Sequence, residues 1–175
     1  MISVILVAQD EEERLLRSLA ALVPLAAEGV VADVVLADLG SRDATVAIAD
    51  AAGCTTVQAS GDIGSAIGQA AAVARKDWLL ALLPGDVPDR ELSLAAQRHV
   101  ALIGRGGPKS AALLALSGTG GSLHRALLSL AFDAFGYSAP HRRRILAPRA
   151  EVLRLAANGR LWRGARLKAR IARGE

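Results

Sequence analysis

Residues 30–45, VVADVVLADLGSRDAT, decide the fold. Val30 to Ala37 is an apolar run rich in valine, which predicts a buried strand. Asp38-Leu39-Gly40-Ser41 supplies turn residues at its end, and Arg42 to Ala52 predicts a helix closed by Gly53. A strand that passes through a polar turn into a helix is the first part of a βαβ unit.

The same pattern precedes this stretch. Met1 to Ala8 is a short run rich in Ile and Val that predicts another buried strand. Asp10 is a candidate cap of the following helix, and the acidic residues after it suit the helix dipole. One helical face is predicted from apolar residues at spacings of three and four: Leu15, Leu16, Leu19, Leu22 and Val23.

The pattern also continues downstream. Thr55 to Gln58 predicts a third strand, Gly61 to Ala74 a helix, and Asp77 to Leu83 a fourth strand that ends at Pro84-Gly85. The first 90 residues therefore predict the order βαβαβαβ, which is typical of a mostly parallel, doubly wound α/β sheet in a single domain. Ligands of such sheets bind outside the carboxyl ends of the strands, where Asp38 and Asp86 lie.

Weaker patterns follow residue 90. They predict helices over 91–103, 123–135 and 149–157, and short strands over 111–116 and 144–146. Residues 160–173 carry Leu161, Trp162, Leu167 and Ile171 among basic residues, and we expect a basic helix there.

Charge divides the chain into two parts. The whole chain has a net charge of +4, with about −5 in residues 1–140 and about +9 in residues 141–175. The basic part is consistent with a solvated helix face, an anionic membrane contact or a nucleic-acid contact. No aromatic stacking series accompanies it, so we expect no specific nucleic-acid partner.

Targeting signals and cysteine content give little information about the function of the chain. No basic stretch precedes the first apolar run, so no export signal is expected, and no apolar run reaches the roughly 20 residues that cross a bilayer. A cytoplasmic location is expected, with possible attachment to the inner membrane face through the basic segment. Cys54 is the only cysteine, which excludes an internal disulfide.

Five segments in order resemble family 2 glycosyltransferases, whose fold is called GT-A. The resemblance covers about residues 2–90. The matching stretches are VILVAQDEE (4–12), ADLGSRDAT (37–45), IADAAG (48–53), the Gly-containing segment from Gly61 to Ala72, and KDWLLALLPGD (76–86).

This resemblance implies a GT-A, Rossmann-like domain over residues 1–140 that binds a nucleotide-diphosphate sugar. A basic, mainly helical segment, 141–175, would pack on this domain or extend from it. The resemblance places the nucleotide among Ala8, Asp10, Asp38, Ser41 and Gly61. It places a divalent cation, Mg²⁺ or Mn²⁺, on Asp86, since hard oxygen ligands suit these ions.

The sequence departs from the family at two catalytic positions. Pro84 occupies the position of the first metal-binding side chain, and a prolyl ring offers no ligand. The carboxylates after Glu91 are Asp133, Glu151 and Glu175, and none belongs to the Glu-Asp pair that carries the family's catalytic base. Two hypotheses follow: an enzyme that transfers the sugar to an acceptor, and an inactive GT-A-like domain that serves as a binding or membrane-associated interaction module.

Overall fold

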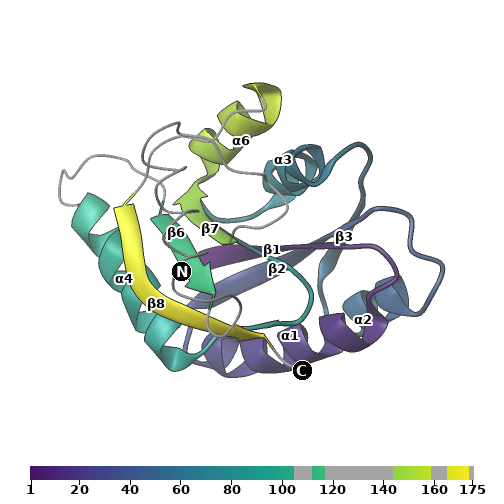
Figure 1. Ribbon diagram of the computed structural model, residues 1–175, viewed down its shortest axis with the longest axis horizontal. Helices are drawn as coiled ribbons and strands as arrows, with labels where there is room; N and C mark the ends of the chain where they lie inside the picture. The colour runs from purple at the N-terminus through teal and green to yellow at the C-terminus, as the bar shows by residue number, and fades with distance from the viewer. Residues whose placement is uncertain (105–111, 117–143, 159–164, 174–175) are drawn as a thin grey trace, which may run out of the picture.

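The computed structural model describes residues 1–104, 112–116, 144–158 and 165–173. Its strands form a mixed sheet in the order β3-β2-β1-β4-β7-β6-β8-β5 (Figure 1). The strands are β1 (Ile2–Ala8), β2 (Val31–Asp38), β3 (Thr55–Gln58), β4 (Trp78–Leu82), β5 (Asp86–Val87), β6 (Ala112–Leu116), β7 (Arg144–Pro148) and β8 (Ala165–Arg173). The described helices are α1 (Glu12–Ala27), α2 (Thr45–Ala51), α3 (Ile63–Val73), α4 (Arg90–Gly104) and α6 (Arg149–Asn158).

The first four strands confirm the predicted parallel arrangement. β1 lies between β2 and β4 and is parallel to both, and β3 pairs in parallel with the other side of β2. Every residue of β1 is buried, as expected for a strand covered by helices on both faces. The α/β class and the mostly parallel character of this part of the sheet were therefore correctly predicted.

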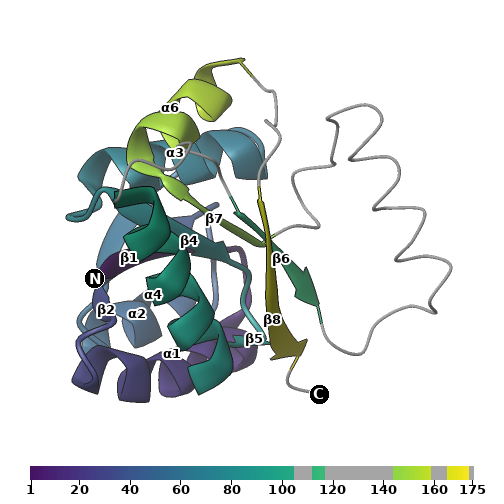
Figure 2. The same cartoon turned by 90° about the vertical axis from the view of Figure 1, so that its left-hand side faces the viewer.

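Alternation along the strands divides the core into two layers. Val4 and Leu6 of β1 pack with α1, α2 and α4, whereas Ile5 and Val7 pack with α3 and α6. Figure 2 shows these two groups of helices on opposite faces of the sheet. This arrangement follows from the two-residue repeat of a strand, which sends successive side chains to opposite faces.

Helix α1 buries a narrower stripe than predicted. Leu15, Leu19 and Leu22 are buried, but Leu16 and Val23 are 57% and 65% exposed. Leu16 follows Leu15 by a single residue, about 100° around the helix, and this rotation places it on the solvent side of α1. The prediction of one continuous apolar face was therefore too wide.

Helix α3 lies very close to α6. A Cβ atom added to Gly68 of α3 would collide with the Cβ atom of Ala156 in α6. Buried Ala66, Ala70 and Ala71 continue the same small-residue surface of α3. The alanine-rich composition of this helix therefore permits a close packing of α6 over the sheet.

The C-terminal elements join the same sheet. β7 is antiparallel to β4 and β6, and β8 runs parallel to β6 and antiparallel to β5. The predictions of strands near 112–116 and 144–148 and of helices near 90–104 and 149–158 are confirmed. The helix predicted at 123–135 lies outside the described residues.

The basic helix predicted over 160–173 is wrong for residues 165–173, which form β8. Arg166, Lys168 and Arg170 alternate with Leu167, Ala169 and Ile171, a two-residue repeat that favours a strand. Backbone hydrogen bonding to β6 and β5 completes this strand. Among the described residues, no helix is both long and apolar enough to cross a membrane.

Candidate functional site

The predicted site residues lie at the carboxyl ends of the parallel strands. Ala8 ends β1 and Asp38 ends β2, and the two are register partners. Gly61 follows β3, and Asp86 follows β4. Because β3, β2, β1 and β4 are parallel, all these residues belong to one edge of the sheet. Asp38 and Asp86 thus lie near the carboxyl ends of β2 and β4, as predicted, but Asp86 begins β5 and both side chains are buried.

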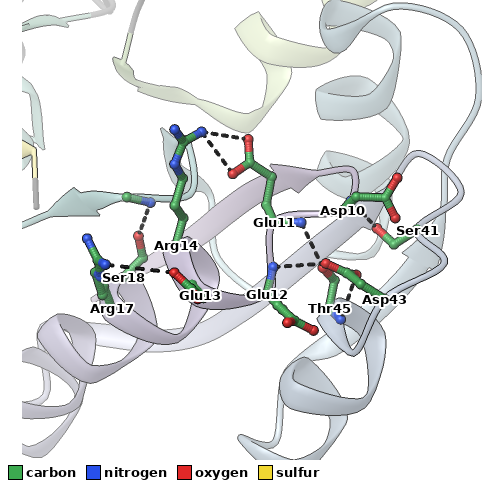
Figure 3. Close-up of polar contacts among 11 residues, drawn as sticks. Asp10, Glu11, Glu12, Glu13, Arg14, Arg17, Ser18, Ser41, Asp43 and Thr45 are labelled. Atoms are coloured by element: carbon green, nitrogen blue, oxygen red, sulfur yellow. Dashed lines mark hydrogen bonds and ion pairs between the residues drawn. The ribbon is translucent and has the colours of Figure 1, made fainter. Parts of the chain in front are cut away.

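Hydrogen bonds join the loop after β1 to the loop after β2 (Figure 3). The backbone N–H of Asp10 donates to the Ser41 hydroxyl at 3.0 Å, and the Arg42 N–H donates to Asp10 Oδ1 at 2.7 Å. Asp10 adopts a left-handed backbone with φ of 53°, which Asp and Asn tolerate better than most residues. Its side chain is exposed. Asp10 and Ser41 are therefore held together by the loops, whereas the prediction that Asp10 caps α1 is wrong.

The first turns of α1 and α2 cap each other instead. The Glu12 N–H donates to Asp43 Oδ2 at 3.1 Å, and the Ala44 N–H donates to Glu12 Oε2 at 3.0 Å. The Glu11 N–H donates to the buried Thr45 hydroxyl at 3.0 Å. These contacts occupy backbone donors that often bind anions at helix N-termini. The N–H groups of Glu11, Glu12 and Ala44 are therefore already satisfied within the protein.

One carboxylate of this network has a perturbed pKa. Asp43 accepts hydrogen bonds from Thr45 and Glu12, and the pKa of its side chain is lowered, chiefly by the bond with the Thr45 side chain. Hydrogen bonds to the charged form of a carboxylate favour that form. The stretch ADLGSRDAT contains Asp43 and Thr45, but it does not reveal that both accept backbone N–H groups at the start of α1.

Asp38 lies beneath the turn that it stabilises. Its side chain is 1% exposed and accepts the N–H of Gly40 at 3.1 Å and that of Ser41 at 3.1 Å. Gly40 has φ of 89°, a conformation that suits glycine. Gly40 is exposed and Ser41 half-buried. A ligand approaching this turn therefore first meets Gly40, Ser41 and Asp10.

The turn after β4 is enclosed. Pro84, Gly85 and Asp86 are all buried, and Asp86 Oδ2 accepts the Leu83 N–H at 2.8 Å. The Gly85 N–H donates to the buried Ser18 hydroxyl at 2.9 Å and to the Arg14 carbonyl at 3.1 Å. In the sheet, Asp86 is also the register partner of Arg173 in β8.

These residues do not fit a divalent cation held by the protein. Asp86 is fully buried with one oxygen engaged by its own turn, and Pro84 has no ligating atom in its side chain. Within the described parts of the chain, no three His, Cys, Asp or Glu side chains gather as metal ligands would. Mg²⁺ and Mn²⁺ need several oxygen ligands, so the described residues at this edge do not form a preformed cation site.

An apolar cavity of about 590 Å³ lies elsewhere, between α1, α2 and β2. It is lined by Val31 and Val34 of β2 and by Cys54, among other residues. Burial raises the pKa of the Cys54 thiol to about 11, so the thiol is protonated at neutral pH. Val31 and Val34 belong to the first half of β2, away from Asp38, so the cavity is separate from the candidate site.

Comparison with known proteins places the fold. No protein-family model matches the sequence, and no curated protein sequence does. Solved structures of glucosyl-3-phosphoglycerate synthase from Mycobacterium tuberculosis are similar to this chain. One, in complex with Mn²⁺, UDP and glucosyl-3-phosphoglycerate, is 21% identical with a TM-score of 0.61 over 86% of this chain and 57% of that chain. Another, in complex with Mn²⁺, UDP-glucose and phosphoglyceric acid, is 20% identical with a TM-score of 0.67 over 100% of this chain and 72% of that chain.

At this level of identity, the likeness establishes the fold. The chain has a GT-A glycosyltransferase fold, with a mostly parallel sheet flanked by helices in a single domain, as the resemblance implied. The chain spans little more than half the length of the first of these enzymes. The roles expected for Ala8, Asp10, Asp38, Ser41, Gly61 and Asp86 remain predictions.

Proposed function

We propose that the chain binds a nucleotide-diphosphate sugar at the edge formed by the loops after β1 and β2. The observation that carries this proposal is the hydrogen-bonded pair of loops, which presents the exposed Asp10 carboxylate beside Ser41. Ligands of open α/β sheets bind at this position. Complexes of similar GT-A structures with UDP and UDP-glucose support the proposal.

Asp10 and Ser41 are the groups suited to base or ribose recognition. Asp10 Oδ1 accepts the Arg42 N–H, and none of the described residues hydrogen-bonds its Oδ2 atom. A carboxylate oxygen accepts hydrogen bonds from a base N–H or from ribose hydroxyls. The Ser41 oxygen accepts the Asp10 N–H, which leaves its own hydrogen to donate. Buried Asp38 and Ala8 shape the site from below, and Gly61 borders it after β3.

A second candidate function is nucleotide-sugar binding without transfer. Asp86 is buried, and Glu151 lies in the first turn of α6, directly after β7. Pro148 at the end of β7 pairs with Trp78 at the start of β4, so Glu151 lies near the amino ends of the parallel strands. Asp38 lies at their carboxyl ends, on the opposite side of the sheet. Glu151 is thus badly placed to serve as a catalytic base. Asp133 and Glu175 lie outside the described residues.

The anionic membrane contact forms no part of this proposal. That expectation depended on a basic helix lying on a bilayer, and residues 165–173 form a strand of the sheet instead. The described residues form no preformed cation site, so the proposal assigns no role to a divalent cation. The experiment below includes Mn²⁺ only to test whether binding depends on it.

Calorimetric titration with UDP and GDP, each with Mn²⁺ and with EDTA, tests the proposal. We expect one nucleotide to bind and Asp10→Asn to weaken its binding by roughly 10- to 100-fold, the equivalent of one charge-assisted hydrogen bond. Asparagine tolerates the left-handed backbone at this position, so the fold is preserved.

Asp50→Asn is the matched control. Asp50 is an exposed carboxylate on α2 that accepts a hydrogen bond from the Thr56 hydroxyl, and it lies outside the loop pair. Its variant should bind the nucleotide as the wild type does. Binding that is equally strong in wild type and Asp10→Asn, or absent for both nucleotides, would contradict the proposal.

A further inference from the structure

Arg14 lies across the turn where the cation was expected. Its carbonyl accepts the Gly85 N–H at 3.1 Å. A Cβ atom built on Gly85 would be 3.6 Å from Arg14 Cδ and 3.7 Å from its Cβ and Cγ atoms. The aliphatic stem of Arg14 therefore covers the buried turn of Pro84, Gly85 and Asp86.

The guanidinium of Arg14 extends beyond this turn toward the loop after β1. Its Nη1 atom lies 3.1 and 3.0 Å from the two carboxylate oxygens of Glu11, the residue after Asp10 (Figure 3). The Arg14 side chain is 61% exposed. An exposed ion pair of this kind contributes little to stability, so a more highly charged anion can replace Glu11 at small cost.

The positions of the strands fit a nucleoside diphosphate. Neighbouring strands lie about 4.8 Å apart, so the ends of β2 and β4, with β1 between them, are separated by about 10 Å. A base or ribose beside Asp10 and Ser41 would then direct its diphosphate toward the β4 end. There, the Glu11 and Glu12 N–H groups at the start of α1 are already occupied by Thr45 and Asp43. Arg14 is an exposed cation whose stem lies against Gly85 of the turn after β4.

We infer that Arg14 binds the diphosphate of the nucleotide, in place of a divalent cation. Guanidinium and phosphate form paired, charge-assisted hydrogen bonds, and arginine remains protonated at any working pH. This inference rests on the proposed function. It explains how the edge accepts a diphosphate although Asp86 is buried and Pro84 cannot ligate.

The test compares nucleotide with nucleoside in EDTA. Wild-type affinity for the bound nucleotide, UDP or GDP, should be the same in EDTA as in Mn²⁺. Arg14→Gln should weaken diphosphate binding by roughly 10- to 100-fold, the loss expected for a charge-assisted contact. The affinity for the matching nucleoside, uridine or guanosine, should change by less than about twofold, since it has no phosphate for Arg14 to bind.

Two further variants isolate the contribution of Arg14 to diphosphate binding. Arg17→Gln removes a cation from the same helix, where Arg17 pairs with Glu13 at 4.0 Å, and should leave both affinities unchanged. Glu11→Gln frees Arg14 of its competing carboxylate and should tighten diphosphate binding.

The outcomes separate this inference from the proposed function. Diphosphate binding that depends on Asp10 but is unaffected by Arg14→Gln, or that requires Mn²⁺, overturns the role of Arg14 alone. Equal losses for nucleoside and diphosphate in Arg14→Gln also overturn it, because they indicate a general change in the site. Absence of any nucleotide binding by the wild type overturns both.

Discussion

Asp38 and Asp86 are both buried near the carboxyl ends of parallel strands, but their surroundings differ. Asp38 is the last residue of β2, whereas Asp86 is the first residue of β5, just after the turn that follows β4. Both accept backbone N–H groups of their own turns. Above Asp38 the chain is open, with Gly40 and Asp10 exposed. Around Asp86 the turn is closed, because Pro84 and Gly85 are buried as well.

This comparison shows that an aspartate at the end of a strand is not in itself a ligand-binding group. In both turns the carboxylate satisfies backbone donors that would otherwise be buried without partners, which is a structural role. The capacity to bind a ligand comes from what lies above the turn. Over Asp38 that is a polar pair of loops, and over Gly85 it is the stem of Arg14.

The largest expected effect comes from removing the enclosed carboxylate. Asp86→Ala deprives the Leu83 N–H of its acceptor and should lower the free energy of unfolding by about 1–3 kcal/mol, measured by urea denaturation. Nucleotide affinity of the folded variant, with or without Mn²⁺, should not change. A loss of Mn²⁺-dependent binding with unchanged stability would instead make Asp86 a metal ligand.

Asp86→Asn is the matched control for this experiment. Its amide oxygen can accept the Leu83 N–H, so it should recover part of the stability lost in the alanine variant. If both variants are as stable as the wild type, the carboxylate does not hold the turn and the comparison with Asp38 fails.

The next largest expected effect is the loss of stability on replacing the glycines of the two turns. Gly40 and Gly85 have φ of 89° and 92°, so alanine is strained at both, by about 1–2 kcal/mol. A Cβ atom meets nothing within 4 Å at Gly40 and only ordinary contacts with Arg14 at Gly85. Gly40→Ala and Gly85→Ala should therefore destabilise the protein about equally in urea. A much larger loss at Gly85 would show that the closed turn is also sterically tight.

Local sequence patterns were sufficient for the first half of the fold. The run at 2–8 is apolar and buried throughout, and the run at 31–38 is buried over its second half. The polar turns after these runs mark the carboxyl ends of the strands. This was enough to predict the parallel strands and the shared edge of Asp38 and Asp86. The alternation that sends the side chains of Val4 and Ile5 to opposite faces of the sheet is also a local property of the sequence.

Long-range pairing could not be read from the sequence. The alternation within residues 165–173 is local, but their pairing with β6 and β5 is not, because the residues of those two strands are more than 45 positions earlier in the chain. The capping of Glu12 by Asp43 joins residues 31 positions apart. The contact of Arg14 with Gly85 forms only where α1 meets the turn after β4. The burial of Asp86 and this contact therefore depend on the tertiary structure.

The smallest expected effect is the pH dependence of the open pair of loops. The pKa of Asp43 is lowered, first by its bond with the Thr45 side chain, so the folded state binds this proton less tightly than the unfolded state. The resulting stability is present above the unfolded pKa of about 3.9 and is lost as pH falls through the lower folded value. Asp43→Asn has no such proton, so its deficit in unfolding free energy relative to wild type should shrink between about pH 6 and pH 3. Urea denaturation across this range measures the deficit. Because Asp43 is only half-buried, the change should be small. A deficit that is constant with pH would mean that the caps joining the two loops do not depend on the charge of Asp43.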